Sequence, residues 1–205
     1  SVISKVKSMG FVANVAAGEY HLNIQNQFDT VYGNTSMGNI RTTISGIKSI
    51  QEYCRTDSFD IENPPRYISF LQKKPKVYEG VKLHPIDFND FKFRVNYKEE
   101  IPLRTNFNIV KSLLSTWESS KKVFRLLKRF TFTNHKYNIQ IDCSVVRSSR
   151  QHKGRLVPEY RIESSGLFTN PESYEVEIEV TKGDIKEDAL LSDIVENIKL
   201  VLSGI

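Results

Sequence analysis

The sequence predicts an α+β domain built mainly from antiparallel β-strands, and three observations lead to this fold class. Polar and apolar residues alternate with a period of two through nine segments rich in Val, Ile, Phe and Tyr. Clusters of Asn, Gly and Pro separate several of these segments, as tight turns between strands require. Only two segments carry apolar residues near helical spacing. Many antiparallel strands with few helices favour a barrel-like sheet.

The alternation gives the expected elements in chain order. The strands are Tyr20–Phe28, Asn39–Ile47, Tyr67–Leu71, Lys76–Tyr78, Phe91–Ile101, Lys122–Thr133, Tyr137–Arg147, Glu159–Glu163 and Tyr174–Thr181. Turns are expected at Gly33-Asn34, Asn63-Pro64-Pro65, Asn134-His135-Lys136 and Asn170-Pro171-Glu172. The two expected helices are Thr105–Ser119 and Asp184–Leu202, and Asp184 can act as the N-cap of the second.

Composition and charge set limits on the class of protein. At 205 residues, with 39% hydrophobic and 26% charged residues, the chain has the composition of a soluble globular protein. Its net charge of +5 suits an anionic ligand such as RNA, although many proteins without such a ligand are equally basic. Cys54 and Cys143 are far apart, which excludes a disulfide framework and indicates a reducing compartment. No apolar run approaches the ~20 residues of a membrane span. We expect a cytoplasmic protein whose residues 1–205 form one domain of a larger chain.

The most informative segment is Ser-Tyr-Glu-Val-Glu-Ile-Glu-Val at residues 173–180. In a strand, Glu175, Glu177 and Glu179 stand on one face, about 6–7 Å apart, and the apolar residues stand on the other. Three neighbouring carboxylates repel one another unless water or cations face them. The row is therefore either the solvent face of an antiparallel strand, which is the commonest use of alternation, or part of a metal site.

Three other expected strands also pair an apolar face with a polar or charged face. Their polar sets are Lys92, Arg94, Asn96, Lys98 and Glu100; Arg125, Leu127, Arg129 and Thr131; and Gln140, Asp142 and Ser144. A closed barrel could turn these faces inward around a charged ligand. Phosphates would then be bound directly and through Mg²⁺ or Mn²⁺, which prefer hard oxygen ligands. A sheet with a wet outer face explains the same pattern, and periodicity does not separate the two.

Four segments in this order resemble the RNA triphosphatase domain of viral mRNA capping enzymes, a triphosphate tunnel metalloenzyme of the kind found in large DNA viruses and fungi. They are Phe-Arg-Val-Asn-Tyr-Lys-Glu-Glu-Ile-Pro-Leu at 93–103, Phe-Arg-Leu-Leu-Lys-Arg-Phe-Thr-Phe at 124–132, Ile-Asp-Cys-Ser-Val-Val-Arg-Ser-Ser at 141–149 and Tyr-Glu-Val-Glu-Ile-Glu at 174–179. Together with Pro-Arg-Tyr-Ile at 65–68 they span roughly residues 60–180. Each segment is short, and the specificity comes from their order, spacing and strand phase.

The resemblance implies an eight-stranded antiparallel β-tunnel that removes the γ-phosphate from the 5′ end of nascent mRNA with Mg²⁺ or Mn²⁺. It implies Glu175 and Glu177, with Glu179 beside them, as metal ligands, and Glu100 as the residue that orients the attacking water. The phosphate-binding residues that it implies are Arg94, Lys98, Arg125, Lys128 and Arg129. The implied partners are the RNA 5′ end and the guanylyltransferase and methyltransferase domains of a capping enzyme, and the implied location is a viral factory or virion.

The sequence departs from the family pattern at several of these positions. The family's first strand carries Glu-x-Glu, whereas the best counterpart here, His-Leu-Asn-Ile-Gln at 21–25, places His21 and Asn23 there. Sliding the alignment by two residues brings in Glu19 but keeps His21. Leu127 stands where the family has a lysine. Gln140 replaces an arginine, and Asn96 replaces a further lysine. Fewer carboxylates weaken the binding of a hard divalent ion.

Three hypotheses about function stay open at this point. In the first, the chain is a metal-dependent RNA 5′-triphosphatase that uses Glu175, Glu177 and either Glu19, His21 or Asn23 at the metal. In the second, it is a degenerate tunnel domain without catalysis, kept as an RNA-binding or scaffold module of a capping complex. In the third, it is a β-rich interaction module whose Glu row is solvated.

Overall fold

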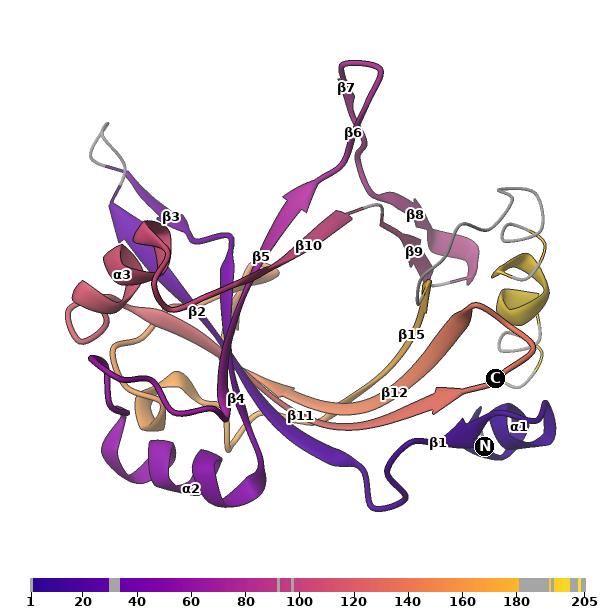
Figure 1. Ribbon diagram of the computed structural model, residues 1–205, viewed down its shortest axis with the longest axis horizontal. Helices are drawn as coiled ribbons and strands as arrows, with labels where there is room; N and C mark the ends of the chain where they lie inside the picture. Colours follow the sequence, from indigo (N-terminus) through magenta and orange to yellow (C-terminus); the bar gives the residue numbers. More distant parts are fainter. Residues whose placement is uncertain are drawn as a thin grey trace. The chain divides into compact units, whose positions relative to one another are not determined.

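The computed structural model describes residues 2–29, 34–91, 93–96, 98–180, 192, 194–199 and 203 (Figure 1). The chain forms two compact units. The first unit comprises Ser1–Tyr20, Leu127–Val146 and Glu172–Ile205, and the second comprises His21–Leu126 and Arg147–Pro171. Antiparallel strands with few helices make up both, which confirms the expected α+β class. Among the helices of the described residues, none has the length and apolar character needed to cross a membrane.

The first unit contains the N-terminal segment and the last strands of the chain. It contains α1 (Val2–Ser8), β1 (Val12–Ala13), the later part of β11 (Lys122–Thr133), β12 (Ile139–Ser148) and β15 (Ser173–Val180). β12 and β15 pair antiparallel along their length, and β1 pairs with the end of β11. Residues 194–199 are helical, within the expected second helix, while most of the Asp184–Leu202 prediction lies outside the described residues.

One face of this small sheet is apolar and is covered by the N-terminal segment. Val6 of α1 and the following Phe11 pack with Phe132, Ile139 and Ile141, and all five are almost fully buried. Because side chains alternate across a strand, burying the odd-numbered residues of β12 places the even-numbered ones on the opposite face. The packing of the core therefore fixes which residues of β12 form the polar face.

The second unit contains most of the remaining elements. They are β2 (Glu19–Asp29, whose first two residues belong to the first unit), β3 (Thr35–Met37), β4 (Ile40–Ser45), α2 (Ile47–Thr56), β5 (Ile68–Pro75), β6 (Val77–Tyr78), β7 (Val81–Lys82), β8 (Ile86–Phe88), a 3₁₀ turn (Asn89–Phe91), β9 (Phe93–Val95), β10 (Lys98–Leu103), α3 (Asn108–Ser115), β13 (Gln151–His152), β14 (Arg155–Leu156) and a second 3₁₀ turn (Glu163–Ser165). The strand order within this unit is β10-β5-β4-β2, all antiparallel.

The core of the second unit is aromatic. Even-numbered residues of β2, β4 and β5 are buried on the side of the sheet where α2 packs against β4. Tyr53 of α2 packs with Phe59, Trp117 and Phe124, and the closest pair of rings, Phe59 and Trp117, has centroids 4.8 Å apart. Odd-numbered residues of the same strands consequently share the other face, which is polar.

The structure corrects the expectation of a closed eight-stranded barrel. The described strands are hydrogen-bonded in the order β10-β5-β4-β2-β11-β12-β15, and within the described residues β10 and β15 each pair on one side only. Part of this difference arises because the strand expected at Phe91–Ile101 is not continuous. It divides into β9, which pairs with β8 in a separate two-stranded sheet, and β10, which pairs with β5.

Other elements differ from the expectation in detail. The helix expected at Thr105–Ser119 is shorter, Asn108–Ser115, and α1 and α2 were not expected. The strand expected at Glu159–Glu163 is wrong, because its only β-type contact is an isolated bridge between Glu159 and Lys122 among the described residues. β11 has the expected bounds, Lys122–Thr133.

The core of the first unit gives a stability prediction. Ile141→Ala should lower the free energy of unfolding by about 3 kcal/mol, because Ile141 is fully buried and its truncation leaves a cavity. Val12→Ala, at a position of the same unit that is 69% exposed, is the matched control and should change stability by less than about 0.5 kcal/mol. Urea unfolding of the three proteins measures the difference, and equal losses in both variants would contradict the packing described.

A buried lysine gives a second prediction. Lys122 is 2% exposed, its ammonium donates to the Ser120 carbonyl at 2.8 Å, and it lies 5.3 Å from the centre of the Trp117 ring. Burial lowers the pKa of Lys122 to about 8, against the opposite effect of Asp57 and Glu118.

Between pH 8 and pH 10.5 the unfolded chain therefore holds a proton on Lys122 that the folded chain has lost. The stability of the native protein should rise with pH across this window relative to that of Lys122→Met, which lacks the group. Unfolding free energies measured at several pH values test this, with exposed Lys48→Met as the control. A pH profile of Lys122→Met parallel to that of the native protein would contradict it.

Candidate metal centre

The register of β12 and β15 brings two polar rows together on one face of the first unit. Asp142 lies directly opposite Glu177, Gln140 opposite Glu179, and Ser144 opposite Glu175. The apolar residues between them point to the core side, where Ile141 is opposite Ile178. Like charges directly opposite one another destabilise a sheet, so this face requires a compensating cation.

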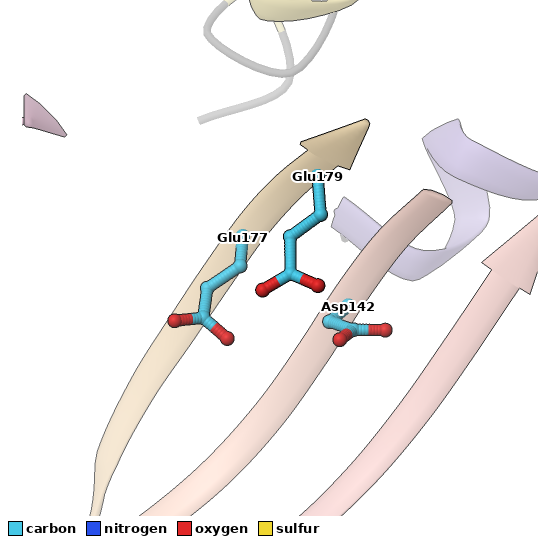
Figure 2. A group of neighbouring side chains, drawn as sticks. All are labelled: Asp142, Glu177 and Glu179. Atoms are coloured by element: carbon cyan, nitrogen blue, oxygen red, sulfur yellow. The ribbon is translucent and has the colours of Figure 1, made fainter. Parts of the chain in front are cut away.

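Three carboxylates converge on this face. Figure 2 shows Asp142 on β12 and Glu177 and Glu179 on β15 with their carboxylates turned toward the same region. One oxygen from each lies within 4.8 Å of the others, and in the part of the chain that the structure describes this is the one group of its kind. The Asp142 side chain has no solvent exposure, whereas Glu177 is 46% exposed. The cluster therefore has a buried base and an open side.

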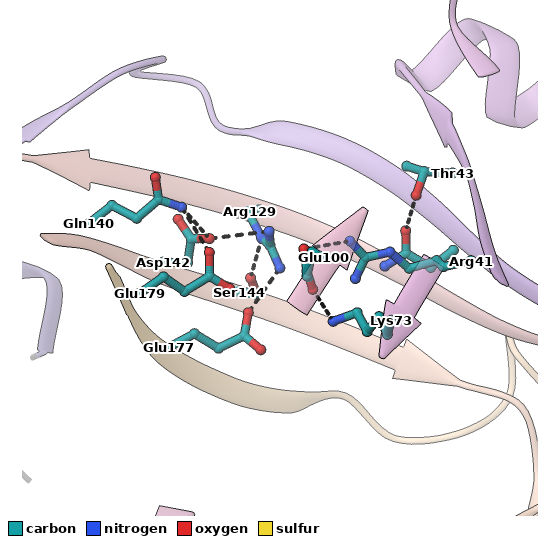
Figure 3. A network of polar contacts seen from close by, with 11 residues as sticks. Arg41, Thr43, Lys73, Glu100, Arg129, Gln140, Asp142, Ser144, Glu177 and Glu179 are labelled. Carbon is teal, nitrogen blue, oxygen red and sulfur yellow. Dashed lines mark hydrogen bonds and ion pairs between the residues drawn. The ribbon is translucent and has the colours of Figure 1, made fainter. Parts of the chain in front are cut away.

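Arg129 of β11 supplies the compensating charge. Its guanidinium contacts Asp142 Oδ2 at 3.2 Å and Glu177 Oε2 at 3.0 Å, and its Nε donates to Ser144 Oγ at 3.4 Å (Figure 3). It is 23% exposed, so these bonds are partly shielded from water and are stronger than those of a surface pair. Arg129 thus neutralises two of the three carboxylates.

Gln140 completes the hydrogen bonding of the cluster. Its amide nitrogen donates to Asp142 Oδ2 at 3.4 Å and to Glu179 Oε2 at 3.1 Å (Figure 3). A neutral amide orients these carboxylates without adding a second positive charge.

The donor set fits a hard divalent cation. All three groups offer carboxylate oxygens, which Mg²⁺, Mn²⁺ and Ca²⁺ prefer. Asp142 Oδ1 is buried and has no hydrogen-bond partner among the described residues, and such an atom is costly unless something binds it. The three oxygens lie within 4.8 Å of one another, whereas neighbouring oxygens around Mg²⁺ lie about 3 Å apart, so the carboxylates would have to close by up to about 2 Å to share one ion. The cluster could hold a metal ion.

The second unit has a polar cluster of its own around Glu100. Lys73 Nζ contacts Glu100 Oε1 at 2.5 Å, and Arg41 contacts Oε2 at 3.9 Å (Figure 3). The three residues come from β5, β10 and β4. Arg41 Nε is buried and has no hydrogen-bond partner. Two cations therefore share one carboxylate.

The residues expected on the first strand bond to hydroxyl groups of β4. His21 Nδ1 lies 3.1 Å from Ser45 Oγ, and Asn23 Oδ1 accepts a hydrogen bond of 2.8 Å from Thr43 (Figure 3 shows the bond from Thr43). The amide oxygen that Asn23 could offer to a metal is therefore already engaged. Glu19 is exposed at the start of β2, and neither it nor His21 belongs to the carboxylate cluster found among the described residues.

The structure places the other expected site residues as follows. Arg125 is half-buried in β11, and Glu175 is half-buried opposite Ser144. Lys128 follows Arg125 on β11 but turns to the other side, with its ammonium 5.5 Å from the Tyr20 ring. Arg94 lies in the β8–β9 hairpin, where it binds Asp87, and Lys98 is exposed at the start of β10.

Sequence reasoning missed Asp142 as a possible ligand, and it missed Arg41 and Lys73 as the partners of Glu100. Asp142 did stand out as a charge in a polar set, but only the pairing of β12 with β15 shows that it lies opposite Glu177. Arg41 alternates with buried Ile40 and Thr42, and this pattern could have placed it on a polar face.

Comparison with known proteins adds no family assignment. The sequence matches no model of a known protein family. It also gave no match in a comparison with curated proteins. Function is therefore inferred from the residues and their geometry, together with the resemblance in the strand segments.

The cluster predicts a specific energetic coupling. Arg129→Met should lower the free energy of unfolding by about 3 to 5 kcal/mol in the presence of EDTA, because it leaves the buried Asp142 carboxylate without its counter-ion. Adding Asp142→Asn to this variant should recover at least half of the loss, since the uncompensated charge is then gone.

Arg55→Met is the control for this experiment. Arg55 pairs with Glu52 in an exposed helical position, and such pairs contribute about 0 to 1 kcal/mol. Equal losses for Arg129→Met and Arg55→Met, or no recovery in the double variant, would contradict the role given to Arg129.

Proposed function

We propose that this chain is a metal-dependent RNA 5′-triphosphatase domain of the mRNA-capping type, which releases the γ-phosphate from the 5′ end of nascent RNA. One observation carries the proposal. Three carboxylates, one of them fully buried with an unpartnered oxygen, converge next to an arginine on the polar face of β12 and β15. The order of the four strand segments that resemble this family supports it.

The chemistry of phosphoryl transfer suits such a site. Little covalent work is asked of the protein, because the reaction depends mainly on positioning the phosphate and neutralising its oxygens. Asp142, Glu177 and Glu179 would hold Mg²⁺ or Mn²⁺. The ion, when bound, supplies Lewis-acid polarisation of a phosphate oxygen. The residues of the chain provide the remaining positive charge and the geometry.

Arg129 has a double role in this proposal. In the structure it neutralises Asp142 and Glu177. When these carboxylates serve as ligands, its guanidinium can turn to a phosphate oxygen, for which its planar fork is well suited. Arg129 would thus bind either the carboxylates or the substrate. This exchange keeps the buried charge compensated with and without the ligand.

The cluster around Glu100 supports the proposed orientation of water and binding of phosphate. Lys73 and Arg41 hold the Glu100 carboxylate from two sides, which fixes its position. In the proposed reaction Glu100 orients the attacking water, and the cations beside it attract phosphate oxygens. Arg94, Lys98, Arg125 and Lys128 stay as proposed phosphate contacts. The proposed partners are the RNA 5′ end and the guanylyltransferase and methyltransferase domains of a capping enzyme.

A second candidate function has an observation of its own. Asn23 and His21 bond Thr43 and Ser45, and they stand where the family carries two glutamates. A tunnel domain with half its carboxylates replaced would hold a metal weakly. Such a domain would bind the triphosphate end or serve as a scaffold without hydrolysing it.

Phosphate release from 5′-triphosphorylated RNA with Mg²⁺ or Mn²⁺ tests the proposal. Glu177→Gln removes one ligand charge at constant shape and should lower kcat/KM by about 100-fold or more. Glu62→Gln, an exposed carboxylate of the second unit, is the control and should leave the rate unchanged. Metal affinity measured by calorimetry should fall in Glu177→Gln only.

The outcomes separate the two candidates. Release that needs no metal, or that survives Glu177→Gln, would contradict the proposed metal centre. Absence of release with retained binding of triphosphorylated RNA would favour the non-catalytic domain.

A further inference from the structure

The positive charge of the chain is concentrated in one short segment. Residues 73–98 contain seven Lys and Arg against three Asp and Glu, a net charge of +4. The rest of the chain contains 22 Lys and Arg against 21 Asp and Glu, so it is nearly neutral. The same 26 residues also hold five of the 22 aromatic residues. We call this segment the basic arm.

The basic arm runs from the last three residues of β5 to the first residue of β10 and contains two successive hairpins. The first is β6–β7, in which Glu79 and Gly80 both have positive φ, 47° and 80°, as a two-residue turn of type I′ requires. Figure 1 shows this hairpin projecting beyond the end of β5. The second hairpin, β8–β9, pairs Ile86 with Val95 and Phe88 with Phe93.

The arm exposes apolar side chains to an unusual degree. Val81 is 65% exposed and Ile86 is 58% exposed, and Val77, Phe88 and Val95 are also open. A two-stranded hairpin is at best marginally stable in water, and a cluster of exposed apolar residues marks a binding surface. The partner must therefore bring apolar or aromatic surface as well as negative charge.

Several of the basic residues of the arm are exposed on its surface. Arg94 is neutralised within the hairpin by Asp87, through bonds of 2.6 and 2.9 Å. Lys74, Lys76 and Lys82 are exposed. Single-stranded RNA complements this surface in two ways. Its backbone is anionic, and its unpaired bases stack on aromatic rings.

We infer that the basic arm is a docking surface for single-stranded RNA. The choice of RNA rests on the proposed function. Lys74, Lys76 and Lys82 contact phosphates. Phe88, which stacks on Phe93 with centroids 4.6 Å apart and is 41% exposed, offers ring surface to a base. This surface is separate in sequence from the residues of the metal centre.

Binding of a 5′-hydroxyl oligouridine of about twelve nucleotides tests the inference, because this probe has no triphosphate for the metal centre. Replacing Lys74, Lys76 and Lys82 together by Gln should weaken binding about tenfold or more at 0.1 M salt. It should also reduce the slope of log affinity against log salt by about 2, since each phosphate contact on a single strand contributes about 0.7.

Two further variants sharpen the test. Replacing exposed Lys7, Lys48 and Lys111 together by Gln changes the net charge equally and should leave both quantities nearly unchanged. Phe88→Leu keeps an apolar side chain but removes the ring, so affinity should fall about fivefold or more with the salt slope unaltered. Circular dichroism and thermal unfolding confirm that each variant is folded.

The binding measurements test whether the basic arm binds RNA, and they do not require catalysis. Equal losses in the two triple variants, or unchanged RNA affinity in the arm variant, would overturn the inference. Loss of binding to a protein partner with RNA affinity intact would overturn it in favour of a protein contact. If no protein releases phosphate while arm-dependent RNA binding persists, the proposed function fails and the inference stands.

Discussion

The polar face of the first unit depends on one constraint: the buried carboxylate of Asp142 lies directly opposite Glu177, and Glu179 is close by. Two opposed negative charges, one of them fully buried, need a cation, and Arg129 provides it. The core on the other side of the sheet enforces this arrangement, because Ile141 packs with the residues of α1 and cannot turn outward. A slip of one residue would bury the acid in that core, so packing energy holds the charges together.

This constraint links stability to ligand binding. Arg129 neutralises Asp142 and Glu177, yet Asp142 Oδ1 has no hydrogen-bond partner among the described residues. The cluster is therefore stable without a metal and still has acceptors that a metal would satisfy. A cation and Arg129 compete for the same carboxylates, and under the proposed function a phosphate would accept the arginine that the cation displaces. Weak or conditional metal binding is the expected consequence.

The second unit separates its tasks by face. Its aromatic core around Tyr53 and Trp117 packs one side of β2, β4 and β5, and the other side carries the hydroxyl, amide and charged groups. His21 and Asn23, the departures from the family pattern, are bonded to Ser45 and Thr43, so these positions are satisfied rather than orphaned. The basic arm, in contrast, has large apolar side chains without cover. A binding role explains such an exposed apolar surface better than a role in stability does.

The amino-acid sequence by itself determined the α+β class, the bounds of β11 and most of β2, β12 and β15, and the shared face of Glu175, Glu177 and Glu179. These properties follow from alternation, which is local and has a fixed period of two. It could not show that Asp142 meets Glu177 or that Lys73 and Arg41 meet Glu100, because these contacts depend on strand register between distant segments. It also could not show the break between β9 and β10, where alternation continues through Phe93–Leu103 although the two parts pair with different strands. Tertiary structure alone decided these points, since strand pairing is set by the competition among cores and turns across the whole chain.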